Sequence, residues 1–347
     1  MSGANLEIVD PTAHPDWDEC LLRGGDEDFF HTAAWGRVLG QSYGYRPLHF
    51  VMREKAAVAF CMPFMAVSSP WTGSRGISLP FTDRCAPFFR EAGHLSEAVN
   101  EVKEYGRTHG WKYVEWRDSA YFHGGEAASE SFLTHEVSIE GSLPELYGHL
   151  DDGNRRNIRK AERENVTIEI GRSAGAVESF YRLHCLTRKR HGLPPQPLSF
   201  FRNVLAYVLT PGLGLIVLAR HGGEDIAAAV FFHFGRTAIY KFGASDPRQW
   251  HLRPNNLVMW KAIQWFGERG FSRLTLGRTE TDNTGLLRFK RGWNARESGL
   301  GYFRFDLERN AHVPAHHRVA AMPRALLARM PAPVLRLIGE MAYKHMG

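Results

Sequence analysis

The sequence is poor in the features that mark disulfide-rich, metal-binding or membrane-spanning proteins. It has 4 cysteines in 347 residues, and Cys20, Cys61, Cys85 and Cys185 form no CxxC pair and have no histidine at metal-ligand spacing. No run of about 18 apolar residues without charge occurs, as a bilayer-spanning helix requires. The N-terminal stretch also lacks the basic-then-apolar pattern of a secretory signal. We therefore expect reduced, mostly buried thiols, no metal site and a cytoplasmic location.

Neither sign of charge is in large excess. The chain has 43 Lys and Arg against 37 Asp and Glu, a formal net charge of +6 at pH 7, and 44% hydrophobic residues. This composition is typical of globular proteins, and the length suits two domains of ordinary size. A mildly cationic surface favours encounters with polyanions such as tRNA, nucleotide-linked precursors or anionic lipid, but it specifies none of them.

An internal similarity organises the chain. Tyr105–Arg117 lines up with Phe266–Arg278, and each segment ends a helix on a glycine, Gly110 or Gly270, that can adopt the left-handed cap conformation. Each glycine is followed by a short alternating strand. Upstream, each half has two more strands, predicted at Pro47–Arg53 and Ala56–Met65 and at Gly214–Arg220 and Asp225–Phe234. The matched order predicts a duplication, with chance similarity as the alternative, and an α/β fold of mixed sheets with helices on their faces.

The predicted domains are residues 1–145, residues 146–310 and a helical tail at 311–347. A basic helix, Asn154–Arg163, opens the second domain with Asn154 as its N-cap. Its arginines Arg155, Arg156 and Arg159 either contact tRNA or other phosphates or form a solvated face. The tail alternates apolar and basic residues, so it either lies on an anionic membrane surface or packs on the first domain or a partner.

The segment Tyr240–Trp293 contains most of the candidate catalytic and binding residues. A strand ends at Ser245, and a helix begins at Pro254 with Asn255 and Asn256 in its first turn, a position that favours anions. The loop between them is bulky and contains Trp250 in place of the glycines that hold a cofactor pyrophosphate. A conventional acetyl-CoA site is therefore not expected there.

A second polar stretch follows the predicted strand Arg273–Leu276. It contains Arg278, Glu280 and Asp282 at the end of that strand, where ligand clefts commonly form in open sheets. Phe289, Lys290 and Arg291 come next. The lysine either stabilises a developing oxyanion, or holds a phosphate or carboxylate, or is a surface lysine beside a core aromatic.

The order of these motifs resembles the C-terminal half of FemAB-like proteins, including the FemX-type transferases. The matching motifs are Phe242-Gly-Ala-Ser245, Arg253-Pro-Asn-Asn256, Gly277-Arg278, Gly285-Leu286 and Phe289-Lys290 with Trp293. Weaker similarities lie at Phe29–Trp35, Arg156–Ala161 and Phe180–Phe201. Together they cover nearly the whole chain.

The resemblance implies two tandem acetyltransferase-like (GNAT) domains and transfer of an aminoacyl or acyl group onto an amine of a cell-envelope precursor. No bound cofactor is implied, and the donor would be aminoacyl-tRNA or acyl-CoA. The family's carbonyl-stabilising lysine falls on Lys290, with Arg278 assisting and Glu280 as a candidate base. Substrate contacts would come from Tyr240, Trp250, Asn255, Asn256, Gln196, Asp282, Phe289 and Arg291.

Three departures from the family pattern bear on the substrate. Leu39 stands where nucleotide-muropeptide-binding members have a lysine, Gln196 and Phe200 replace an Arg–Tyr pair, and Phe242 precedes Gly-Ala-Ser, with Tyr240 expected on the same strand face. These differences leave both peptidoglycan and exopolysaccharide precursors open as substrates. The alternatives are an acyl-CoA-dependent N-acyltransferase and a non-catalytic scaffold of an envelope polysaccharide system, peripheral at the inner face of the cell membrane through its tail.

Overall fold

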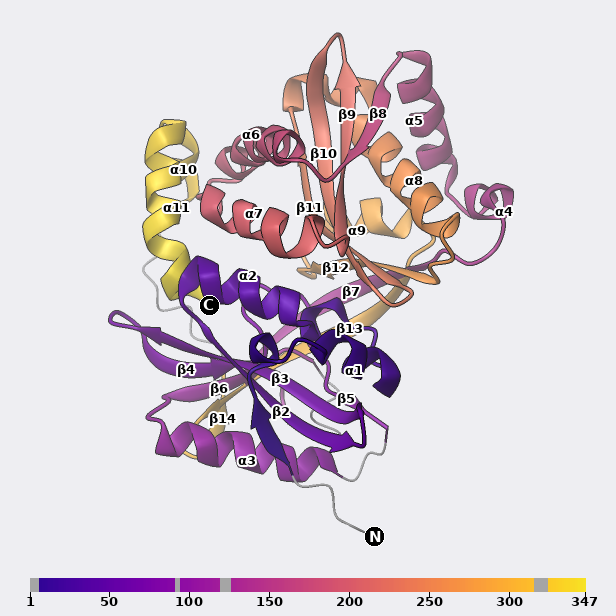
Figure 1. Cartoon of the computed structure of the whole chain (residues 1–347). Coiled ribbons are helices and arrows are strands. Elements are labelled where there is room, and N and C mark those ends of the chain that lie inside the picture. The colour runs from indigo at the N-terminus through magenta and orange to yellow at the C-terminus, as the bar shows by residue number, and fades with distance from the viewer. Residues whose placement is uncertain (1–5, 91–93, 119–125, 315–323) are drawn as a thin grey trace. The chain divides into compact units, whose positions relative to one another are not determined.

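The computed structural model describes residues 6–90, 94–118, 126–314 and 324–347, which form two compact units (Figure 1). The first unit contains the described residues up to Leu133, those from Gly299 to Pro314, and Tyr343–Gly347. The second contains Thr134–Ser298 and the described part of Arg318–Ala342. The predicted linker and start of the tail fall partly on residues 315–323, which lie outside the described residues.

A mixed sheet with helices on its faces forms the first unit. The strands run in the order β1-β2-β3-β4-β6-β13, and β4 and β6 are the parallel pair. Its elements are β1 (Glu7–Val9), α1 (Trp17–Gly24), α2 (Ala33–Tyr43), β2 (Arg46–Glu54), β3 (Ala57–Ser69), β4 (Gly73–Ile77), β5 (Phe88–Phe89), α3 (Leu95–Thr108), β6 (Tyr113–Trp116), β13 (Arg296–Asp306) and β14 (Ala311–Val313).

A second mixed sheet, in the order β7-β12-β11-β10-β9-β8, forms the other unit, with β11 and β12 parallel. Helices α6 and α7 lie on one face, and α5 and α8 on the other (Figure 1). The elements are β7 (Glu130–Ser138), α4 (Leu143–Gly148), α5 (Asp152–Arg163), β8 (Thr167–Gly171), α6 (Ala174–Arg190), α7 (Leu198–Val204), β9 (Gly214–His221), β10 (Glu224–Phe234), β11 (Thr237–Ser245), α8 (Pro254–Gly267), β12 (Arg273–Thr279), α9 (Thr284–Arg291), α10 (Arg324–Arg329) and α11 (Ala332–Met346).

The two units repeat one topology, as the internal similarity predicts. In each, three antiparallel strands are followed by a helix that returns the chain to a strand parallel to the third: β2-β3-β4-α3-β6 and β9-β10-β11-α8-β12. The glycines after the two helices, Gly110 and Gly270, have φ of +66° and +77°, the left-handed conformation that glycine adopts without strain. The predicted α/β class with mixed sheets is confirmed.

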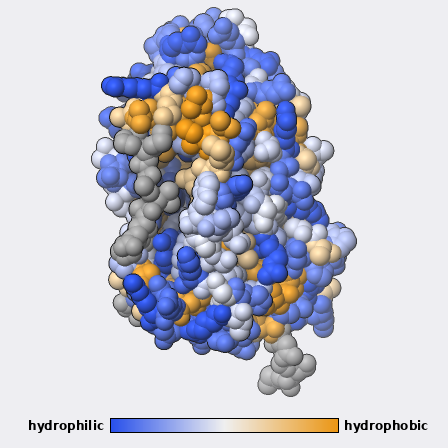
Figure 2. Space-filling view, turned by 90° about the vertical axis from the view of Figure 1, so that its left-hand side faces the viewer, coloured by the Kyte–Doolittle hydropathy of each residue, from blue (hydrophilic) through white to orange (hydrophobic). Residues whose placement is uncertain are grey.

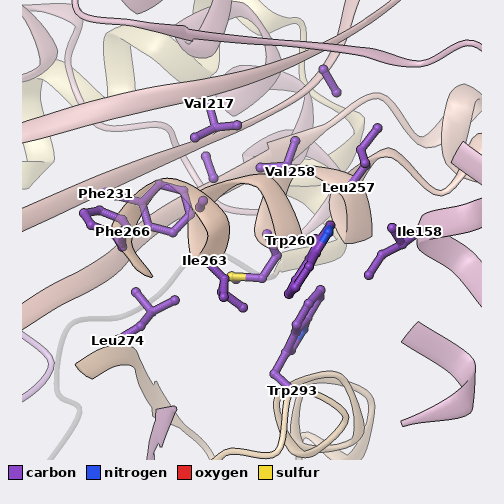
Figure 3. Packing of buried hydrophobic residues seen from close by; sticks show 14 of the residues in the cluster. Ile158, Val217, Phe231, Leu257, Val258, Trp260, Ile263, Phe266, Leu274 and Trp293 are labelled. Carbon is purple, nitrogen blue, oxygen red and sulfur yellow. The ribbon is translucent and has the colours of Figure 1, made fainter. Parts of the chain in front are cut away.

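Each unit has its own hydrophobic core. In the second unit, the core between the sheet and α8 includes Phe231, Trp260 and Phe266, all at most 5% exposed. Trp293, which follows α9, belongs to the same core, and its ring lies beside that of Trp260 (Figure 3). The core therefore fixes the end of α9, the helix that carries Lys290.

Two local predictions are wrong. The N-cap of α5 is Asp151, whose carboxylate accepts from Asn154 N at 2.6 Å, while Asn154 itself lies buried in the first turn. Also, β12 does not end at Leu276 but continues to Thr279. Gly277 permits this continuation, because it kinks the strand at a φ of +70°.

The C-terminal helices contact the second unit. Gly339 in α11 sits so close to Pro195 that a Cβ there would lie 2.1 Å from the Pro195 carbonyl oxygen, and Leu335 is 1% exposed. The last residues belong to the first unit, where the Gly347 carbonyl accepts from Arg75 Nε at 2.7 Å. Among the described residues, none of the helices has the length and apolarity needed to cross a bilayer.

Candidate active site

The two parallel strands of the second unit pair over only part of their length. The register joins Thr237–Ile239 to Arg273–Thr275, although β11 continues to Ser245 and β12 to Thr279. Because parallel strands end at the same edge of a sheet, the unpaired ends of β11 and β12 share one edge. Backbone groups at such an edge are available to bind a substrate.

Lys290 reaches this edge from α9. Its side chain is 2% exposed, and Nζ donates to the carbonyls of Gly277 at 2.8 Å and Arg278 at 2.9 Å. The kink at Gly277 belongs to the same stretch of β12 as these two carbonyls. A buried ammonium is costly unless its donors are paired, so the two carbonyls hold the positive charge in a fixed place within the unit.

Neighbouring contacts lock α9 and therefore Lys290. Phe289 packs edge-on against Trp293, with ring centroids 6.0 Å apart. Gly292, directly after the helix, accepts from Asp151 N at 3.2 Å through its carbonyl. A Cβ on Gly292 would lie 2.7 Å from the Asp151 carboxylate, so a larger residue would displace this N-cap side chain of α5.

A buried histidine, which the sequence did not single out, accompanies the lysine. His135 on β7 is fully buried, and its Nε2 lies 3.0 Å from Glu297 Oε2. Burial, together with the positive charge of Lys290, lowers the pKa of His135. The predicted substrate residue Arg291 forms a bidentate ion pair with the same Glu297 at 2.9 Å. No sequence signal could have linked His135 with Lys290, because 155 positions separate them.

Three buried polar atoms in this region make no hydrogen bond within the described residues: His135 Nδ1, Thr279 Oγ1 and Trp293 Nε1. Buried polar groups normally have partners, and an unsatisfied one costs about 1–3 kcal/mol.

A second group of the predicted site residues is hydrogen-bonded to Ser245, at the end of β11. Its Oγ accepts from Trp250 Nε1 at 2.8 Å and from Asn255 Nδ2 at 3.3 Å. The indole of Trp250 is 41% exposed, and the Arg190 guanidinium lies 4.3 Å from its ring centroid. An exposed aromatic ring stacked with arginine is a suitable surface for a nucleobase or another flat group.

The remaining amides have internal partners. Asn256 Nδ2 donates to Asn154 Oδ1 at 2.7 Å and ties the start of α8 to α5. Gln196 Oε1 lies 2.8 Å from His184 Nε2. Both interactions fix the positions of loops and helices around the sheet edge. A direct contact of Asn256 or Gln196 with substrate stays a prediction.

The expectation that Tyr240 and Phe242 share a strand face is wrong. Val230 pairs with Phe242 and Phe231 with Tyr240, so β11 has an extra residue, Lys241, at a bulge. The bulge reverses the alternation of side chains. Tyr240 consequently packs on Phe231 in the main core, where burial raises its pKa to about 12. Phe242 contacts an aromatic cluster on the opposite face, formed by Phe180, His184, Phe200 and Phe201.

The acidic and basic candidates outside the buried group face solvent. Glu280 and Asp282 are exposed at the turn after β12, and Arg278 is half-buried. On α5, Arg156 and Arg159 are exposed, while Arg155 pairs with Asp152 at 2.5 Å. The structure therefore places Lys290 and Arg278 together at the end of β12, while Arg156 and Arg159 are exposed on α5.

The second unit is similar to acetyltransferase (GNAT) domains. A family model described as acetyltransferase (GNAT) domain matches residues 153–291. The structure is also similar to FemX, with a TM-score of 0.67 and 14% identity over 87% of this chain and 98% of that one. A tandem GNAT protein from the clavulanic acid biosynthesis pathway gives a TM-score of 0.52 at 10% identity over 87% and 99% of the two chains.

Two further proteins are similar to this chain, and one of them is named as an alanyltransferase. L-PGS from Bacillus licheniformis has a TM-score of 0.56 and 14% identity over 95% of this chain and 98% of that one. The UDP-N-acetylmuramoylpentapeptide-lysine N(6)-alanyltransferase of Weissella viridescens is 22% identical over 130 residues, which is 38% of either chain. The match thus spans well under half of that relative. Together these similarities confirm the predicted resemblance to the FemAB-like family.

Proposed function

We propose that the protein transfers an aminoacyl or acyl group onto an amine of a cell-envelope precursor, at the edge formed by the ends of β11 and β12. The observation that carries this proposal is the buried Lys290 ammonium, held by the Gly277 and Arg278 carbonyls at that edge. Fixed positive charge in a site shielded from water stabilises developing negative charge far more strongly than it would in solvent.

The proposed step is aminolysis of an activated ester. The amine nitrogen of the acceptor attacks the carbonyl carbon of the donor, and the carbonyl oxygen becomes the oxyanion that Lys290 stabilises. The C–O bond of the ester then breaks, and the leaving hydroxyl takes the proton that the amine loses. Because the leaving hydroxyl takes the proton, the reaction does not require a dedicated base. If one takes part, the exposed Glu280 and Asp282 are the candidates.

The preferred donor is aminoacyl-tRNA. The stacked pair of Arg190 and Trp250 would accept the terminal base of the tRNA, and the exposed arginines Arg156 and Arg159 would contact its phosphates. Acyl-CoA is the alternative donor. Against it stands the start of α8, where Arg253 adopts a left-handed conformation and the Asn255 and Asn256 amides already have side-chain partners.

The tail adds a proposed membrane contact. On α11, Leu335 faces inward, while Val334, Leu337 and Met341 recur at helical spacing on the outside, each 42–56% exposed. Figure 2 views the side on which α10 and α11 lie, and apolar patches are exposed there among hydrophilic residues. With the exposed Arg329 and Arg336 nearby, this outer face suits an anionic lipid surface.

A donor assay tests the proposal. The purified protein is incubated with labelled aminoacyl-tRNA or labelled acyl-CoA, each against a panel of amine-bearing peptidoglycan and exopolysaccharide precursors. Labelled amide product from aminoacyl-tRNA supports the proposal, and product from acyl-CoA alone supports the alternative donor. If neither donor yields product with any acceptor, and neither binds, a non-catalytic scaffold replaces the enzyme as the better account.

A further inference from the structure

The first unit exposes an aromatic side chain that belongs neither to the site at the ends of β11 and β12 nor to α11. Trp71 lies in the turn between β3 and β4 and is 70% exposed, more than any other large hydrophobic side chain among the described residues. The turn projects from the sheet of the first unit (Figure 1). A single exposed apolar side chain needs no explanation, so the residues around Trp71 decide what it does.

Two kinds of contact hold Trp71 in a fixed position. Ser69 Oγ accepts from the backbone N–H groups of Trp71 and Thr72, each at 3.2 Å. The same oxygen lies 2.9 Å from His345 Nδ1, in the last turn of α11. The His345 ring packs against the indole of Trp71, with ring centroids 4.0 Å apart. Because the indole is already held in place, its binding to a partner loses little conformational entropy.

More exposed apolar side chains belong to the helix that Trp71 contacts. Met346 directly follows His345 and is 54% exposed. Since α11 is one helix, His345 shares a face with Met341 and Leu337, four and eight positions earlier. Among the described residues, every large hydrophobic residue that is at least half exposed therefore lies in α11 or, as Trp71 does, contacts its last turn.

The surroundings of Trp71 carry positive charge. The segments Val67–Ile77 and Tyr343–Gly347 contain no acidic side chain. Lys112 reaches the turn, because its Nζ lies 2.8 Å from the position that a Cβ on Gly73 would take. Lys112 and Lys344 are both exposed. An exposed indole is thus accompanied by two accessible ammonium groups.

We propose that Trp71 is an interfacial anchor, which binds the headgroup region of an anionic lipid bilayer together with Lys112 and Lys344. An indole ring combines a large apolar body with a polar N–H, and tryptophan is enriched where acyl chains meet headgroups. Lysines beside it attract anionic headgroups. The inference rests on the membrane contact proposed for α11 and adds a contact from the first unit.

A saccharide is the other partner that an exposed indole suits. The lysines favour the bilayer, because a neutral saccharide gains nothing from two ammonium groups. The two partners also differ in their dependence on conditions. Binding to a bilayer through this surface requires anionic lipid and weakens as salt screens the lysines, whereas stacking on a neutral sugar depends on neither.

Co-sedimentation of the full chain with phosphatidylglycerol vesicles and with phosphatidylcholine vesicles tests the anchor. Trp71→Ala should weaken binding to the anionic vesicles at least about fivefold, because a large apolar side chain is no longer inserted. Lys112→Gln with Lys344→Gln should weaken it at low salt. Leu22→Ala, at a 44% exposed leucine of α1, is the control and should bind like the wild type. Wild-type protein that binds both kinds of vesicle equally, or Trp71→Ala that binds like the wild type, overturns the anchor.

Fluorescence provides a second readout that does not depend on a large change of side chain. The chain contains 9 tryptophans, and Trp71→Phe keeps all the others. Lipids brominated near the headgroup should quench the wild type more than Trp71→Phe, and equal quenching contradicts insertion of Trp71. Turnover of Trp71→Ala with soluble precursors should match the wild type, so failure of the anchor is distinguishable from failure of the acyl-transfer proposal.

Discussion

At the scale of single residues, the second unit contains buried charged groups and several buried polar groups. The Lys290 ammonium is held by two backbone carbonyls, and His135 beside it has its pKa lowered by burial and by that charge. The resemblance predicted Lys290, but burial and partners depend on α9 packing through Trp293, which no local pattern reveals. His135 was missed because it lies on a strand remote in sequence.

A second buried histidine makes the stability of this unit depend on pH. His184 lies in the aromatic cluster with its Nε2 beside Gln196, and burial first, then Arg188, lowers its pKa to about 3. The unfolded chain takes up a proton near pH 6.5 and the folded chain does not, so stability is full above pH 6.5. It should fall toward pH 3 by up to roughly 1.4 kcal/mol per pH unit.

Urea unfolding of the wild type and His184→Gln between pH 7.5 and 4.5 measures this dependence. His184→Gln should flatten it, although His233, whose pKa is lowered to about 4, leaves a part of the slope. The exposed His251→Gln serves as the matched control and should keep the wild-type slope. An unchanged slope in His184→Gln would show that this histidine does not titrate as described.

At the scale of elements, the sequence predicted the strands and helices that have strong patterns. β9, β10 and α8 begin within one residue of the predicted positions, because buried alternation and a Pro start are local signals. The length of β12 and the bulge in β11 were missed. The positive φ of Gly277 and the extra residue in β11 depend on how each strand pairs with its neighbours. They therefore cannot be predicted from the sequence of the strand alone.

The contact of α11 with Pro195 gives a prediction for this helix. Gly339→Ala should displace α11, because the new Cβ would lie 2.1 Å from the Pro195 carbonyl oxygen, which cannot move without moving the backbone. Hydrogen exchange over Ala332–Met346 should rise, with a fall in unfolding temperature. Gly148→Ala in α4, where the Cβ meets nothing within 4 Å, should be neutral or gain up to about 1 kcal/mol. Equal exchange in both variants would contradict the close contact.

The α5 arginines carry a separate prediction about tRNA. Replacing both Arg156 and Arg159 by glutamate should weaken tRNA binding and reduce the slope of log K against log salt by roughly 0.7–0.9 for each phosphate that is no longer neutralised. Filter binding at several salt concentrations measures the slope. Arg107→Glu with Arg309→Glu, at two exposed arginines of the first unit, is the charge-matched control. If this control pair weakens binding as much as the α5 pair does, the effect belongs to net charge and not to α5.

At the scale of the whole molecule, the duplicated topology could be predicted but the division of the chain could not. A domain boundary near residue 145 and a separate tail were expected from composition. In the structure, the first unit instead consists of three separate segments of the chain, and two of them are Gly299–Pro314 and Tyr343–Gly347. Strands and helices that return from distant positions leave no signal in local composition.

The exposed face of the tail predicts binding to anionic vesicles. Leu337→Ser with Met341→Ser should reduce co-sedimentation with phosphatidylglycerol vesicles, since these side chains are 56% and 50% exposed and would insert into the bilayer interface. Leu22→Ser, at a comparably exposed leucine of α1, should leave binding unchanged. Wild-type protein that stays in the supernatant with anionic vesicles would rule out the membrane contact.

The central claim is that the charge of Lys290 stabilises the oxyanion of acyl transfer. The most direct measurement compares turnover of Lys290→Met and Lys261→Met, a lysine at the surface of α8, with the donor and acceptor that the donor assay identifies, alongside their unfolding temperatures. We predict that Lys290→Met remains folded but loses at least about 100-fold in turnover, as removal of an oxyanion donor does, while Lys261→Met keeps the wild-type rate. A folded Lys290→Met protein with wild-type turnover would contradict the claim.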